Sequence, residues 1–314
     1  MGSPDGETFV GEFTRSANLA SLRPATSPTW GAQPWRDPEI RPGSYKITQV
    51  ERVGQVRPPT GASSWRPLAI SADGSHALAR IPGGFVVHEI GGNDVAVVTT
   101  YAVTCATMNP TGTCAVVGAE KGAVYSINLS GEIGLIELAP AGEQPVSTVA
   151  SDWASGRVLF ATGEAVYEWA GAPSRLEGSF FHQWSPAPPA ASELGPNGSL
   201  YLGAEDGTLV SYGPDPEWDR TFPEALGGPA EPPVTALGVV GHRAGAVIGL
   251  TACADHTLRL WEGSYPGIYS DLVTFDSEGG SVIALGHTDS LITHALTSTG
   301  VILRVTVSHR VSAR

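Results

Sequence analysis

Few residues in this sequence that are capable of chemistry occur in a pattern that catalysis or metal binding requires. Histidine is a common general base and metal ligand, yet no two stand at ligand spacing among His88, His182, His242, His256, His287 and His294. The chain also lacks a Gly-x-Ser-x-Gly nucleophile turn and a Gly-x-x-x-x-Gly-Lys-Ser/Thr phosphate loop. We therefore expect no enzymatic activity, no metal and no cofactor.

Acidic residues stand beside a tryptophan in two stretches, Asp152-Trp153 and Glu217-Trp218-Asp219, and could supply a carboxylate pair. A pair of carboxylates can share acid and base roles in catalysis. Acidic residues in turns more often accept hydrogen bonds from nearby backbone N–H groups. We therefore interpret both stretches as solvated caps.

The charge balance argues against a phosphate-rich partner. The 314 residues include 18 Lys and Arg against 31 Asp and Glu, a formal charge of −13. Nucleic-acid binding generally needs a clustered basic face, whereas the arginines of the N-terminal part are spread over Arg15, Arg23, Arg36, Arg41, Arg52 and Arg57. The sequence predicts protein partners and no nucleic acid.

Targeting and redox features point to the cytoplasm. No apolar run approaches the ~20 residues that cross a bilayer, so no membrane insertion is expected. The first residues lack the basic-then-apolar pattern of a secretory signal. Three cysteines cannot all pair, which a reducing compartment permits. Cys105 and Cys114 flank a turn at residues 109–112. A disulfide between them is therefore one interpretation, although free thiols are the favoured one.

A short pattern recurs along the chain, in which a turn precedes alternating apolar residues. Copies occupy residues 120–127, 162–169, 205–212 and 251–261, with weaker copies at 84–88 and 300–305. Their last residues follow one another at intervals of 39 to 49 residues, close to the ~40–45 that a four-stranded propeller blade needs. Helical periodicity is weak, and 39 Gly and 25 Pro interrupt the chain. The pattern predicts an all-β propeller.

The most specific copy runs from Thr251 to Trp261. Two leucines alternate with Arg259, which is typical of a half-buried strand with the arginine facing outward. The copy resembles the Asp-x-Thr-Leu-Arg-Leu-Trp signature of WD40-repeat propellers. That resemblance implies that Thr251, Asp255 and Trp261 form part of the structural motif of the blade, with Trp261 packed between neighbouring blades.

The repeat divides residues 46–314 into six blades of four antiparallel strands. Only three strands follow the start of the sixth blade near Val282, so residues 46–53 are expected to complete it and close the ring, as WD40 proteins do. Seven blades stay open if residues 1–45 hold further strands. In a second parse, residues 286–290 form a Gly-His loop, residues 291–296 become an inner strand, and the chain ends two strands early.

Residues 1–45 are expected to form an irregular arm. Five prolines between Pro24 and Pro42 oppose ladder pairing. Trp30 and Trp35 either belong to a solvated linker or anchor the arm in a groove. Residues 3–10 are similar to the turn and strand that open a blade, so an incomplete extra blade also stays open.

One end of the ring should carry the function. The loops that enter the inner strands and the turns that precede the third strands share this end, here called the top face. The candidate partner-binding residues that we place there are Trp65, Arg66, Lys121, His182, Trp184, Asp206 and His256. Aromatic residues and arginine contribute strongly to protein interfaces, so we expect a non-catalytic scaffold within a protein complex.

The alternative is a propeller enzyme, or a small-ligand-binding protein, that uses the central channel. Such a protein would gather carboxylates or histidines on its inner strands. The predicted inner strands at residues 68–70, 104–107, 147–150 and 235–237 contain almost none.

Overall fold

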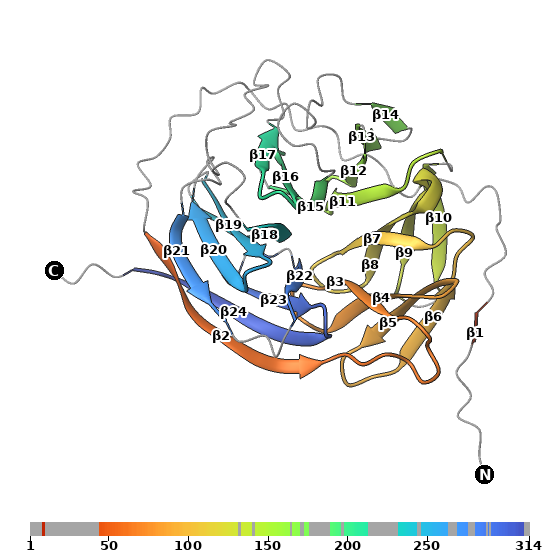
Figure 1. The fold of residues 1–314 in the computed structure, drawn as a ribbon, viewed down its shortest axis with the longest axis horizontal. Helices are drawn as coiled ribbons and strands as arrows, with labels where there is room; N and C mark the ends of the chain where they lie inside the picture. The colour runs from red at the N-terminus through yellow and green to blue at the C-terminus, as the bar shows by residue number, and fades with distance from the viewer. Residues whose placement is uncertain are drawn as a thin grey trace, which may run out of the picture.

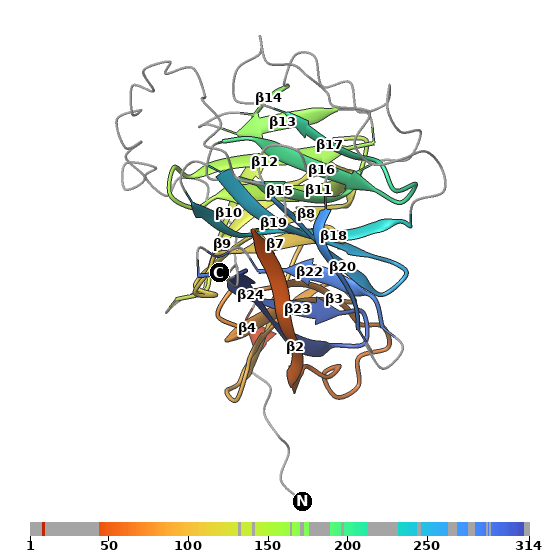
Figure 2. The ribbon, with the colours of Figure 1, turned by 90° about the vertical axis from the view of Figure 1, so that its left-hand side faces the viewer.

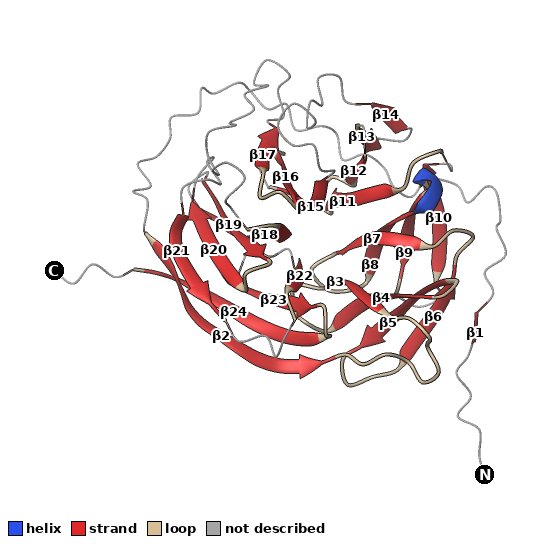
Figure 3. Ribbon diagram, in the orientation of Figure 1, coloured by secondary structure: helices blue, strands red, loops and turns tan. Residues whose placement is uncertain are grey.

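Six β-sheets are arranged radially around a central axis in the computed structural model of the protein (Figure 1). The structure describes residues 8–9, 44–130, 133–139, 142–163, 165–169, 173–175, 189–195, 198–212, 232–243, 246–262, 269–275, 280–286, 288 and 290–310. Strands dominate this part of the chain, and its single short helix, η2, spans Glu120–Gly122 (Figure 3).

The first three blades each place four strands in chain order from the centre outward. Blade one contains β3 (Arg66–Ile70), β4 (His76–Ile81), β5 (Gly84–Glu89) and β6 (Asp94–Val98). Blade two contains β7 (Val103–Met108), β8 (Cys114–Ala119), β9 (Val124–Asn128) and β10 (Gly134–Ala139). Blade three contains β11 (Val146–Asp152), β12 (Arg157–Thr162), β13 (Val166–Trp169) and β14 (Pro173–Arg175).

The last three blades follow the same plan. The described strands of blade four are β15 (Pro189–Leu194), β16 (Leu200–Ala204) and β17 (Leu209–Tyr212). Blade five contains β18 (Val234–Arg243), β19 (Ala246–Cys253), β20 (Thr257–Glu262) and β21 (Tyr269–Thr274). Blade six contains β22 (Val282–Leu285), β23 (Ile292–Thr297), β24 (Val301–His309) and β2 (Tyr45–Gln55).

The predicted six-bladed propeller is confirmed. Each inner strand contacts the inner strands of both neighbouring blades, including β22 with β3 across the seam of the ring (Figure 1). The second parse of the last blade is wrong, because β22 is its inner strand and β23 pairs with β22 on one side and β24 on the other.

The N-terminal strand closes the ring, as predicted. Strand β2 pairs antiparallel with β24 from Tyr45 opposite His309 to Gln55 opposite Val301 (Figure 2). It is also tied to blade five, because the Tyr45 N–H donates to Glu262 Oε1 at 2.8 Å. The closing strand therefore joins two blades.

A short strand near the N-terminus, β1 (Thr8–Phe9), pairs in parallel with the outer strand β6. Thr8 lies opposite Ala96 and Phe9 opposite Val97. The described residues of the arm therefore extend the first blade and do not begin a seventh sheet. Trp30 and Trp35 lie outside the described residues.

The core lies between blades, and this location corrects one expectation. All six residues of β20 are buried, so Arg259 does not face outward. Trp261 packs on the blade-four side with Tyr201, and Leu258 and Leu260 pack in a cluster that includes blade six. A middle strand has a neighbouring blade on each face, so strict alternation does not indicate a solvated side here.

The three cysteines are free. Cys105 lies on β7 and Cys114 on β8, but their cross-strand partners are Gly118 and Asn128. No helix in the described part of the chain is long and apolar enough to span a membrane.

Candidate interaction face

The top face is built by the alternation of strand direction within each blade. Inner strands begin at this end, and because strands alternate, the turn between the second and third strands returns to the same end. The described turns that form it include residues 82–83, 120–122, 205–208, 254–256 and 298–300.

The sequence-predicted residues that the structure describes lie at this end of the ring. Arg66 is the first residue of β3 and is exposed. Lys121 is exposed in η2, whereas Asp206 and His256 are half-buried in the turns before β17 and β20. His182 and Trp184 lie outside the described residues.

Trp65 makes more contacts within the ring than its position just before an inner strand predicted. The half-buried indole packs against a cluster that includes Ile70 of blade one and Leu296 of blade six. Its Nε1 donates to His88 Nε2 at 3.4 Å, and His88 Nδ1 lies 2.9 Å from Asp94 Oδ1. Trp65 therefore fills the seam between the first and last blades.

Gly300 makes room for this indole. A Cβ at Gly300 would lie 2.7 Å from Cη2 of Trp65, which is closer than packed carbon atoms approach. Gly300 also adopts φ 83°, a conformation that glycine reaches without steric cost. The seam thus depends on glycine at this turn.

Two candidate residues occupy strained turn positions on the top face. Lys121 has φ 66° and His256 has φ 62°. A left-handed conformation costs a non-glycine residue roughly 1–2 kcal/mol. The His256 ring makes an edge contact with Phe275 at 6.1 Å between centroids, which partly explains its position. Lys121 is exposed, and its side chain makes no hydrogen bond or ion pair in the described part of the chain.

The turn aspartates hold the backbone of the top face. Asp206 Oδ1 accepts the Thr208 N–H at 3.0 Å. Asp255 Oδ1 accepts the Thr257 N–H at 3.1 Å and the Thr257 hydroxyl at 2.6 Å. These side-chain bonds fix the two turns locally, so both residues act first on turn geometry.

Trp261 and Thr251 form a buried pair in blade five. The Trp261 Nε1 donates to Thr251 Oγ1 at 3.2 Å, and both residues are almost completely buried. The indole satisfies its only polar group within the core. Asp255 lies in the turn between their strands.

Hydroxyl groups link neighbouring inner strands around part of the central channel. The Thr104 hydroxyl of β7 donates to the Val146 carbonyl of β11 at 2.6 Å. Thr148 of β11 and Ser192 of β15 share a hydrogen bond of 2.6 Å between their hydroxyl oxygens. These hydroxyls are engaged in holding blades together.

Burial raises the pKa of Cys105 on β7 to about 12. The thiol is therefore protonated at neutral pH and a poor nucleophile. No group of three or more His, Cys, Asp or Glu residues able to hold a metal occurs among the described residues.

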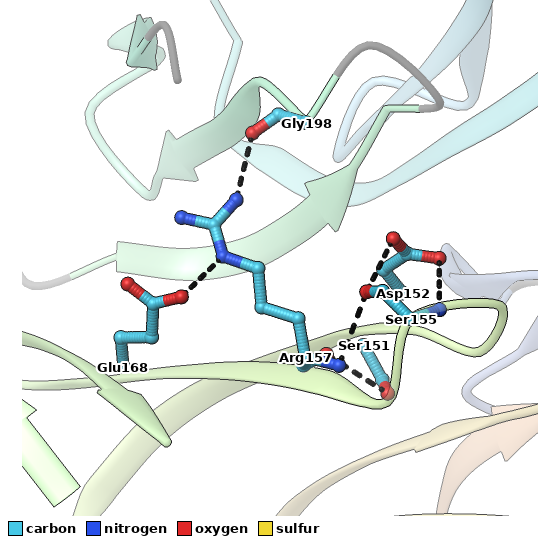
Figure 4. A network of polar contacts seen from close by, with 6 residues as sticks. All are labelled: Ser151, Asp152, Ser155, Arg157, Glu168 and Gly198. Carbon is cyan, nitrogen blue, oxygen red and sulfur yellow. Dashed lines mark hydrogen bonds and ion pairs between the residues drawn. The ribbon is translucent and has the colours of Figure 1, made fainter. Parts of the chain in front are cut away.

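The opposite end of the ring carries inter-blade links. Arg157 Nε donates to Glu168 Oε1 at 2.6 Å, and its Nη1 donates to the Gly198 carbonyl of blade four at 3.1 Å (Figure 4). Asp152 accepts N–H and hydroxyl groups from the adjacent turn, as expected of a cap. Glu217 and Asp219 lie outside the described residues.

Sequence reasoning missed one feature of the top face, which is Arg80. It lies directly opposite Arg66 across β3 and β4. Pairing the two strands around the turn at residues 72–75 would have placed the two cations close together.

A comparison with solved structures agrees with this architecture, whereas two other comparisons found no match. No family model matches the chain, and no curated protein matches it. A solved structure described as "YCF48 bound to D1 peptide" matches with a TM-score of 0.53, 13% identity and 82% of each chain covered. The chain is a β-propeller. At that identity the similarity shows the fold alone, and this fold serves both enzymes and binding platforms.

Proposed function

We propose that this propeller is of the WD40 type and acts without catalysis, binding protein partners through its top face as a scaffold within a complex. The Trp261–Thr251 hydrogen bond and the turn at Asp255 support the WD40 assignment. The free thiols support a reducing compartment, and we propose the cytoplasm.

The observation that carries the proposal is the presentation of charged side chains on rigid turns. Lys121 is held at a left-handed position, and the turn of Asp206 is fixed by its own side chain. Strained residues persist when the surrounding structure holds them, and they concentrate where a site must be preorganised. A rigid surface loses little conformational entropy when a partner binds.

Two further observations favour binding over catalysis in the channel. The inner-strand hydroxyls of Thr104, Thr148 and Ser192 already hold neighbouring blades together. The similar propeller YCF48 is described as bound to a peptide, so a protein of this fold is known in a peptide complex.

Site-specific photo-crosslinking in extract of the native host tests the proposal. A photoreactive residue replaces Lys121 or Glu205 on the top face. Matched controls carry it at Val53 or Leu272, which are 47% and 51% exposed on the outer strands β2 and β21. We expect one partner protein to crosslink from both top-face positions and from neither control. The same partner at all four positions, or none at Lys121 and Glu205, would contradict the proposal.

A further inference from the structure

Two arginines face each other on the top face with no acidic side chain paired to either of them among the residues that the structure describes. Arg66 of β3 lies directly opposite Arg80 of β4, and Phe85 of β5 lies opposite Arg80. Directly opposed residues of antiparallel strands project from the same face, with Cβ atoms about 4.5–5.5 Å apart. Phe85 is buried in a cluster with Val103 of blade two. The two guanidinium groups therefore lie at the top of the interface between blades one and two.

The electrostatics of blade two agree with this placement of Arg66. Burial raises the pKa of Cys105 on β7 to about 12, and the positive charge of Arg66 opposes that rise. The charge of Arg66 thus reaches the first strand of the neighbouring blade. Arg66 is exposed and Arg80 is half-buried.

Neither guanidinium makes a hydrogen bond or ion pair in the part of the chain that the structure describes. Other arginines of the ring do find carboxylates, since Arg157 pairs with Glu168 and Arg304 with Glu51. Like charges directly opposed across a sheet are destabilising. A chain with a formal charge of −13 has many carboxylates that could neutralise this pair. The Arg66–Arg80 pair is therefore suited to bind an external anion.

We propose that the Arg66–Arg80 pair binds the carboxylate side chains of an acidic peptide segment of a protein partner. This assignment rests on the proposed function and names the chemistry of the partner. Guanidinium groups bind carboxylates through paired, charge-assisted hydrogen bonds. An exposed ion pair contributes little on its own, so a small anion would bind weakly and affinity must come from an extended segment.

The charge distribution of the top face favours an acidic peptide over nucleic acid. Blade four lies across the ring from blade one, and its turn before β17 carries the exposed Glu205 beside Asp206. A continuous phosphate backbone laid over this face would meet these carboxylates. A peptide can place its acidic residues over blades one and two only.

Fluorescence polarisation with two labelled peptides tests the assignment. One probe alternates Glu with Ala, and the other has Gln in place of every Glu. We expect the Glu peptide to bind at least about tenfold more tightly than the Gln peptide at low salt, with the difference shrinking at high salt. Arg66→Gln and Arg80→Gln should each weaken binding of the Glu peptide by roughly three- to fivefold, as for the loss of one exposed ion pair.

The matched control is Lys46→Gln, which removes one positive charge from an exposed position on β2. It should leave binding unchanged. The melting temperature of either arginine variant should stay the same or rise, because a repulsive pair is relieved. The assignment would be overturned if a variant carrying both Arg66→Gln and Arg80→Gln bound the Glu peptide as tightly as the wild-type protein. Competition would also overturn it if a single-stranded oligonucleotide or inorganic phosphate displaced the labelled Glu peptide at a lower concentration than unlabelled Glu peptide does.

Failure of this assignment is distinguishable from failure of the proposed function. If the wild-type protein does not prefer the Glu peptide but the Lys121 crosslink to a partner persists, the acidic ligand is wrong and the interaction face stands. If the Lys121 crosslink is also absent, both are wrong.

Discussion

At the scale of single residues, the top face combines side chains that stabilise the ring with side chains that do not. Trp65 was expected to be available to a partner, yet its indole is packed between blades one and six and bonded to His88. Lys121 is the contrasting case, since it is exposed and sits in a strained backbone conformation. Binding variants should therefore be made at Lys121 before Trp65.

Replacing Lys121 by glycine should stabilise the protein. The variant relieves the left-handed strain, part of which is offset by the greater freedom of glycine in the unfolded chain, so we expect a gain of about 0.5–1 kcal/mol. Urea unfolding measures the change. Glu120→Gly in the same turn is the control, because Glu120 has no left-handed conformation to relieve, and it should destabilise. A loss of stability in Lys121→Gly would contradict the strain argument.

Replacing Trp261 by alanine should be costly. The residue is 1% exposed between blades four and five, so its truncation leaves a cavity and should lower the free energy of unfolding by about 3–5 kcal/mol. Thr251→Val keeps the shape but leaves the indole N–H without its acceptor, and should cost about 1–3 kcal/mol. Denaturant unfolding of both variants measures these losses. A loss below ~1 kcal/mol for Trp261→Ala would mean that the indole does not carry the inter-blade packing.

At the scale of elements, the turns at the end of the ring opposite the top face connect successive blades. In the turn between β3 and β4, the Asp73 N–H donates to the Pro110 carbonyl of blade two at 3.1 Å. His294 Nδ1 of blade six lies 2.7 Å from the Ala72 carbonyl of the same turn. One turn thus joins three blades.

This turn should make stability depend on acid pH. Burial raises the pKa of Asp73, but hydrogen bonds from Ser71 and Ser75 outweigh it and hold that pKa below its ordinary value. A carboxyl with a lowered folded pKa contributes stability above its unfolded pKa of about 3.9, and loses it as pH falls through the folded value. Asp73→Asn should therefore be less stable than wild type at neutral pH, with the difference vanishing in acid. Urea unfolding across this range measures it, and a difference independent of pH would contradict the assignment.

The repeat pattern predicted the positions of the strands better than the contacts that their side chains make with neighbouring blades. Each blade's turns and alternating residues are local features, so the strands around Val124, Val166 and Leu209 could be located from the sequence. The burial of Arg259 and the packing of Trp65 depend on contacts between blades that are distant in sequence. Local periodicity contains no information on such contacts.

At the scale of the whole molecule, the ring depends on a strand from the opposite end of the chain. Strand β2 supplies the outer edge of blade six and contacts blade five through Glu262 and Asp271. This closure was predictable because the last repeat was one strand short. The opposed Arg66 and Arg80 were not predicted, since their significance appears only when β3 and β4 are paired.

Removal of the closing strand should destroy the ring. A protein comprising residues 58–314 leaves the edge of β24 unpaired and should aggregate. A protein comprising residues 43–314 keeps β2 and should unfold cooperatively, because the described part of the removed segment pairs only through Thr8 and Phe9. Size-exclusion chromatography and thermal melts compare the two. A monomeric, cooperative 58–314 protein would contradict closure by β2.

The central claim is that the top face binds the partner. Hydrogen exchange of the protein, with and without the partner that crosslinks at Lys121, tests this claim most directly. Binding should slow amide exchange in the top-face turns at residues 120–122, 205–208 and 254–256, and leave the outer strands β10 and β21 unchanged. Protection confined to those outer strands, or to inner strands β7 and β11 as for a ligand in the channel, would contradict the account.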